Sequence, residues 1–89
     1  MAITLNIPLN LQIKAGTVTA ASFSGSPKKV TITFATAFPD TNYAINITGT
    51  DNRNWDWESK STGSFVINAN AATGLTGNVD WTAISIGES

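Results

Sequence analysis

The sequence predicts an all-β protein: a six- to seven-stranded antiparallel β-sandwich preceded by an extended N-terminal arm. Three observations lead to this fold class. Thr, Val, Ile, Phe, Trp and Asn occur in short runs separated by Gly, Pro, Ser and Asp, a pattern typical of strands joined by turns. The apolar residues do not recur at helical spacing. The 89 residues contain no cysteine, so one modest core without disulfides must hold a single domain together.

The first element is a long alternating stretch, "ITLNIPLNLQIK", at residues 3–14. Alternation with a period of two predicts a strand with one apolar and one polar face. Extended, it spans about 40 Å at roughly 3.3 Å per residue, whereas a domain of this length is only about 30 Å across. We therefore expect either an edge strand that bends at Pro8 or an arm whose apolar face lies on a neighbouring copy or a larger particle. The predicted assembly or docking residues are Ile3, Leu5, Ile7, Leu9, Leu11 and Ile13.

The remaining elements follow from turn residues. Gly16 is expected to end the arm, which divides the chain into an arm at residues 1–16 and a sandwich domain at residues 17–89. In the last strand Ile84 and Ile86 are out of phase with Val79, Trp81 and Ala83, so a bulge or a change of face is expected near Ala83. Between Gly, Pro, Asp and Asn clusters, the expected strands lie at residues 17–23, 30–38, 43–49, 53–59, 64–68 and 78–87.

Composition excludes several classes of function. The chain has no histidine or cysteine, a formal net charge of −1, and only 12% charged residues. A nucleophilic triad and a zinc site therefore lack their residues, and no basic patch is present for nucleic acid. No apolar run approaches the roughly 20 residues of a membrane helix, and no secretory leader is visible. We expect no enzymatic activity, no catalytic residue, no metal, no cofactor, no nucleic-acid binding and no membrane insertion.

The densest polar and aromatic stretch is "GTDNRNWDWESKSTGSF" at residues 49–65. An indole can stack on the C–H face of a sugar while Asp, Arg and Asn bond its hydroxyls, so the candidate ligand-binding residues are Asp51, Arg53, Asn54 and Trp55. The alternative is that the tryptophans, Trp57 included, pack between the sheets. Arg53 is expected to face inward, in phase with the two tryptophans, and then needs a partner, either Asp51 or a neighbouring subunit.

Several short motifs, in a fixed order, carry a resemblance over residues 28–86. They are "VTITFATAFPDTNYAINIT" at 30–48, "GSFVIN" at 63–68 and "VDWTAI" at 79–84. This part of the chain resembles the H-type lectin-like domain found at the ends of bacteriophage tail fibres and in other small phage virion proteins. That family has an aliphatic strand, "F-P", an aromatic-led strand, "GF" and "W-A" in this order. Here Ser64 separates Gly63 from Phe65.

The resemblance implies a six-stranded sandwich that assembles as a homotrimer about a three-fold axis. In the animal lectins of this family, sugar is bound between protomers, but the absence of histidine departs from several of those sites. We expect a phage virion structural protein of a tail fibre or host-facing appendage, made in the host cytoplasm, that contacts other virion proteins and contributes to recognition of a bacterial surface glycan. The alternative is a capsid decoration or tail-accessory protein that cements the particle without binding sugar.

Overall fold

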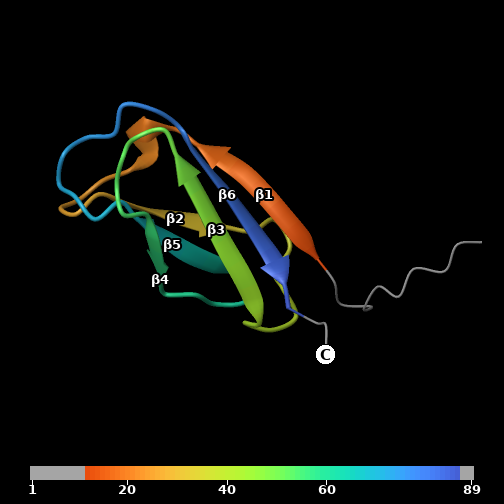
Figure 1. Ribbon diagram of the computed structural model, residues 1–89. Helices are drawn as coiled ribbons and strands as arrows, with labels where there is room; N and C mark the ends of the chain where they lie inside the picture. Colours follow the sequence, from red (N-terminus) through yellow and green to blue (C-terminus); the bar gives the residue numbers. More distant parts are fainter. Residues whose placement is uncertain (1–11, 87–89) are drawn as a thin grey trace, which may run out of the picture.

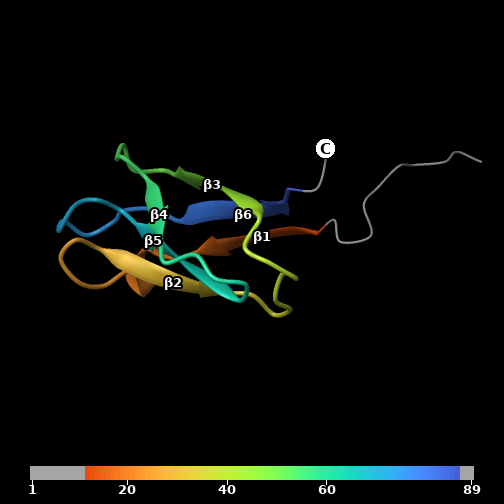
Figure 2. The same cartoon turned by 90° about the horizontal axis from the view of Figure 1, so that it is seen from below.

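The computed structural model describes residues 12–86, which form two antiparallel three-stranded sheets packed face to face (Figures 1 and 2). One sheet has the strand order β1-β6-β3 and the other β2-β5-β4, and in Figure 1 the first lies in front of the second. The predicted all-β class is confirmed, and the arrangement is consistent with a β-sandwich. The strands are β1 (Ile13–Val18), β2 (Lys29–Thr33), β3 (Tyr43–Gly49), β4 (Asp56–Glu58), β5 (Ser64–Asn68) and β6 (Val79–Ser85), with a 3-10 turn at Ala20–Ser22.

The core lies between the sheets because alternate residues of each strand point inward. Phe34, just after β2, is at its centre, and its ring centroid lies 5.1–5.8 Å from those of Phe38, Tyr43, Phe65 and Trp81. The rings of Phe38 and Tyr43 stack at 4.3 Å. The buried apolar residues are Phe23, Ile32, Phe34, Phe38, Tyr43, Phe65, Ile67, Ala69, Val79 and Ala83.

Tyr43 ties the core to the β4–β5 loop. Its hydroxyl donates to the carbonyl oxygens of Ser61 and Ser64, at 2.6 and 3.1 Å. Burial raises the pKa of this phenol above its usual value, because ionisation would place a charge in the core. The turn before β3 has the local bond expected of an Asp there, since the Asn42 N–H donates to Asp40 Oδ1 at 2.8 Å.

Several sequence-based expectations about the strands are wrong, and β2 ends at Thr33 instead of the expected residue 38. Gly16 does not end a strand: β1 passes through it, opposite Trp81 of β6. A Cβ at Gly16 would lie 2.9 Å from the Trp81 ring, so the missing side chain makes room for the indole. Residues 17–23 therefore do not form the expected separate strand. The expected bulge near Ala83 is also not present, because β6 pairs one residue to one with β3 throughout and simply places Ile84 on the outer face.

The N-terminal arm is described only from residue 12 onward. Residues 13–16 of the predicted arm belong to β1, and the predicted docking residues Ile3, Leu5, Ile7, Leu9 and Leu11 lie outside the described residues. The inner face of β1 carries Lys14, whose Nζ lies 4.9 Å from the Phe38 ring centroid. Ile13 faces the other way and is 67% exposed. Ile13 is the one predicted docking residue within the described range, and its side chain faces away from the core.

Candidate functional site

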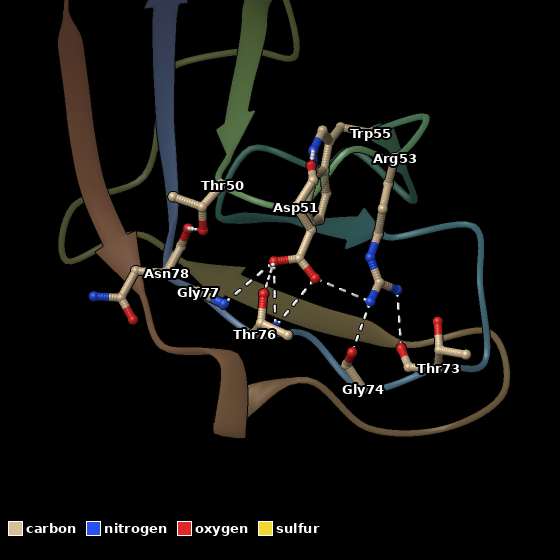
Figure 3. Close-up of polar contacts among 9 residues, drawn as sticks. All are labelled: Thr50, Asp51, Arg53, Trp55, Thr73, Gly74, Thr76, Gly77 and Asn78. Carbon is tan, nitrogen blue, oxygen red and sulfur yellow. Dashed lines mark hydrogen bonds and ion pairs between the residues drawn. The ribbon is translucent and has the colours of Figure 1, made fainter.

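The sequence-predicted site lies where the β3–β4 loop (residues 50–55) meets the β5–β6 loop (residues 69–78), as Figure 3 shows. The Asp51 carboxylate reaches from the first loop to the second. Its Oδ1 accepts hydrogen bonds from Thr76 Oγ1 at 2.8 Å and from the backbone N–H groups of Thr76 and Gly77, both at 3.2 Å. These bonds hold the pKa of Asp51 below its ordinary value of 3.8, with the Thr76 hydroxyl as the largest cause.

Arg53 completes this contact between the loops. Its Nη2 donates to Asp51 Oδ2 at 3.1 Å and to the Gly74 carbonyl at 2.8 Å, and its Nη1 donates to the Thr73 carbonyl at 2.9 Å. The side chains of Asp51 and Arg53 are each only 10% exposed. The prediction that Arg53 pairs with Asp51 is confirmed. We call this set of contacts, made by residues 51, 53, 73, 74, 76 and 77, the Asp51–Arg53 clasp.

Trp55 and Asn54 complete the predicted set. The Trp55 Nε1–H donates to the Asp51 carbonyl at 3.3 Å, and the ring meets Phe23 edge-on at 6.2 Å. The same indole occupies the space that a side chain at Gly49 would need. Asn54 is exposed, and its carbonyl accepts a bond from Asn70 Nδ2. The fold therefore brings all four residues together, but it uses the polar groups of Asp51 and Arg53 to join two loops.

The chemistry open to the clasp follows from these bonds. A carboxylate that already accepts from two backbone N–H groups, a hydroxyl and a guanidinium has little capacity left for a ligand hydroxyl. The guanidinium is similarly bound to two carbonyl oxygens. A ligand at Asp51 or Arg53 would have to displace bonds that fix both loops. The geometry is that of a structural connection, and the ligand-binding role of Asp51, Arg53, Asn54 and Trp55 stays a prediction.

The sequence predicts that Trp57 packs between the sheets, but the structure leaves this residue exposed. Trp57 lies opposite Ile67 and so on the inner face, but β4 is an edge strand and the residue is 39% exposed. Lys60 covers part of it: Nζ lies 5.0 Å from the Trp57 ring centroid and 4.9 Å from that of Tyr43. The same Nζ donates to the Tyr43 carbonyl at 2.9 Å. A cation–π contact with two rings thus closes this flank of the sandwich.

A second polar site lies on the outer face of the β2-β5-β4 sheet. It is a shallow depression of about 360 Å³. Lys29 Nζ and Glu58 Oε1 form an ion pair at 2.6 Å across it, and the Lys29 hydrogen bond is the main cause that lowers the pKa of Glu58. Each of these two side chains is about two fifths exposed. The depression is lined by Ser22, Ser24, Lys29, Val30, Thr31, Glu58 and Val66.

Sequence reasoning missed this depression. Neither Lys29 nor Glu58 is among the candidate site residues named from the sequence. Nothing local marks the pair, because 29 residues separate its members and only the strand order β2-β5-β4 brings them together. The alternation around Glu58 does predict that its side chain faces outward.

Two further findings concern the whole set of described residues. Over residues 12–86, no three metal-ligating side chains gather into a group that could hold an ion. Within the same range, no helix has the length and apolar character needed to cross a membrane.

No protein-family model matches the chain, and no curated protein matches it significantly.

Proposed function

We propose that the chain is a bacteriophage virion structural protein that assembles as a homotrimer and contacts other virion proteins. The observation that carries the proposal is the orientation of Ile13. It is the last apolar residue of the alternating arm, it lies in β1, and it is 67% exposed on the face opposite the core. Arm residues in the same phase need a surface outside their own core, and an assembly supplies one.

The resemblance to the H-type lectin-like domain supports this proposal through the core. Its motif residues, which are widely separated in sequence, lie in one cluster of rings. Phe38 of "F-P" stacks on Tyr43, which leads β3, at 4.3 Å. Phe65, the counterpart of the aromatic residue in "GF", meets Trp81 of "W-A" edge-on at 5.7 Å. The aromatic residues of these short motifs thus pack against one another, as expected of residues that define a shared fold.

The geometry favours a particle-stabilising role over sugar recognition at the predicted site. The polar groups of Asp51 and Arg53 serve the clasp, whereas apolar side chains are exposed where the arm enters the sheet. A capsid decoration or tail-accessory protein needs such a docking face and no ligand pocket. Location on a head, a tail fibre or another appendage is then the feature to determine.

The test is to find the protein on purified virions of the phage that encodes it. Mass spectrometry of gradient-purified particles should detect the chain at a fixed ratio to the major structural proteins. Gold-labelled antibody should then mark one structure, head or tail, in electron micrographs. Absence of the chain from purified particles would contradict the proposal, whatever its oligomeric state in solution.

Recognition of a bacterial surface glycan is the second candidate function, and the depression around Lys29 and Glu58 is the observation that favours it. Serine and threonine hydroxyls, an ammonium and a carboxylate line it, together with the apolar side chains of Val30 and Val66. These groups suit the hydroxyls and C–H faces of a saccharide.

A glycan array compares the wild type, Glu58→Gln and Arg53→Ala. Binding lost only in Glu58→Gln supports the depression, loss only in Arg53→Ala supports the clasp residues, and a blank array for the folded wild type contradicts both.

A further inference from the structure

The outer face of the β1-β6-β3 sheet is divided along its length by polarity. At the end where the chain enters β1, Ile13 lies opposite Ile84, which in turn lies opposite Ala44 of β3. Ile86 follows at the same end and is 58% exposed. At the far end, Thr17, Asp80 and Thr48 form the equivalent row. We call residues 13, 15, 44, 84 and 86 the arm-end patch; it is apolar and carries no charge.

The arm continues this patch in phase. Gln12 is still paired with β6: its N–H donates to Ser85 Oγ at 2.7 Å, and its carbonyl accepts from the Ser85 N–H at 2.9 Å. The chain therefore enters the sheet along the line of β1. The apolar residues at positions 3 to 11 share the odd-numbered phase of Ile13, and residues 2–13 carry no charged side chain. The arm and the patch thus match in chemistry.

The reach of an extended chain limits how much of its own patch the arm could cover. Residues 2–12 contain no glycine, and their only proline is Pro8. From Gln12 to Pro8 an extended chain moves about 13 Å away from the sheet, and residues 3–7 could return only about 16 Å, at roughly 3.3 Å per residue. A reversal at Pro8 would bring only the tip of the arm back to Ile13, so most of the patch would stay uncovered.

From this geometry we infer that residues 3–11 of one copy lie across the arm-end patch of a second copy. This inference rests on the proposed homo-oligomer and names the surfaces that form it. Each copy contributes one arm and one patch, so a closed ring of copies covers every arm and every patch. The contact is apolar and uncharged, so its dissociation constant should change less than threefold between 50 mM and 1 M NaCl.

Cysteine crosslinking tests the inference directly, because the chain has no cysteine of its own. One full-length variant carries Leu9→Cys in the arm, and a second, with a different affinity tag, carries Ala44→Cys in the patch. The two are co-expressed and oxidised, and the mixed disulfide is measured on non-reducing gels. We expect at least ten times more of it than in two control mixtures. One control replaces Leu9→Cys by Asn10→Cys, in the opposite phase; the other replaces Ala44→Cys by Thr31→Cys, on the outer face of the other sheet.

Each other outcome overturns the inference. Equal crosslinking to Thr31→Cys means that the contact is not specific to the patch. A disulfide formed only within the single-chain variant Leu9→Cys/Ala44→Cys means that the arm folds back on its own copy. An oligomer without the mixed disulfide assembles through another surface, which leaves the proposed homotrimer intact. A monomer contradicts both the inference and the homotrimer.

A second pair of variants does not depend on oxidation. Ile13→Asn alters an exposed side chain and should leave the circular-dichroism spectrum unchanged, yet it should weaken assembly at least tenfold in sedimentation velocity. Thr33→Asn is the matched control, since Thr33 is also an exposed strand residue but lies on the opposite sheet, and this variant should assemble as the wild type does. Equal assembly of the two variants would overturn the inference.

Discussion

Gly49→Ala should destabilise the protein strongly, because the end of β3 has no room for a side chain. An added Cβ would overlap the Cζ2 and Cε2 atoms of the Trp55 ring and lie 2.8 Å from its Nε1. The ring cannot easily yield, since Nε1 is bonded to the Asp51 carbonyl and the ring packs against Phe23. Overpacking of this kind costs about 1–3 kcal/mol. At roughly 4–8 °C per kcal/mol for a domain of this size, a loss of about 2 kcal/mol lowers Tm by about 8–16 °C.

Thermal and urea unfolding followed by circular dichroism measure the effect, with Gly63→Ala as the matched control. No atom lies within 4 Å of a Cβ built at Gly63, so that variant should match the wild type or gain up to about 1 kcal/mol. In a Trp55→Ala background, Gly49→Ala should become nearly neutral, which gives a coupling energy close to the whole effect. A Gly49→Ala protein within about 0.5 kcal/mol of wild type, which is the usual range for surface changes, would refute the packing of Trp55 against β3.

Three further predictions concern the core and the clasp. Tyr43→Phe removes the hydroxyl that donates to the Ser61 carbonyl, while the Ser64 carbonyl still accepts from the Ser61 N–H and Oγ. The change should cost about 1–2 kcal/mol in urea unfolding; no change would mean that water replaces the hydroxyl. Phe65→Ala should cost about 3–5 kcal/mol, because the ring is fully buried, and a cost below about 1 kcal/mol would contradict the core described above. Asp51→Asn should make the free energy of unfolding less dependent on pH in the acid range. The folded state lowers the pKa of Asp51 below 3.8. The ionised carboxylate therefore stabilises the fold above pH 3.8, and this stabilisation is lost as the pH falls through the pKa of the folded state. A pH dependence identical to that of the wild type would contradict this role of Asp51.

Most of the fold was predictable because its signals are local. β3 and β5 begin and end at the predicted residues, since each alternates cleanly and is preceded by turn residues. β1 was not predictable in the same way. Gly16 lies within a strand because the ring of Trp81 occupies the space that a side chain at this position would need. Trp81 comes 65 positions later in the chain, so no local signal at Gly16 indicates this contact. The phase of Ile84 has the same origin, because pairing with β3 keeps β6 regular and places this apolar residue outside.

The candidate site was predictable only in part. Spacing along the chain indicated that Asp51 and Arg53 could pair, and they do. The groups that bind them come from Thr73, Gly74 and Thr76, 20 to 25 residues later. A loop of small residues has no periodicity from which its position can be derived. Polar residues that suit a ligand also suit a link between two loops, and only the three-dimensional arrangement distinguishes the two uses.

The central claim is that the apolar phase of the arm is covered by a second chain. The most direct test is the molar mass of the full-length protein in multi-angle light scattering, measured over a range of micromolar concentrations. We expect a mass close to three times the 9.4 kDa of the chain, and a folded monomer for the variant that lacks residues 2–11. A wild-type protein that remains at the mass of one chain at every concentration would contradict the claim.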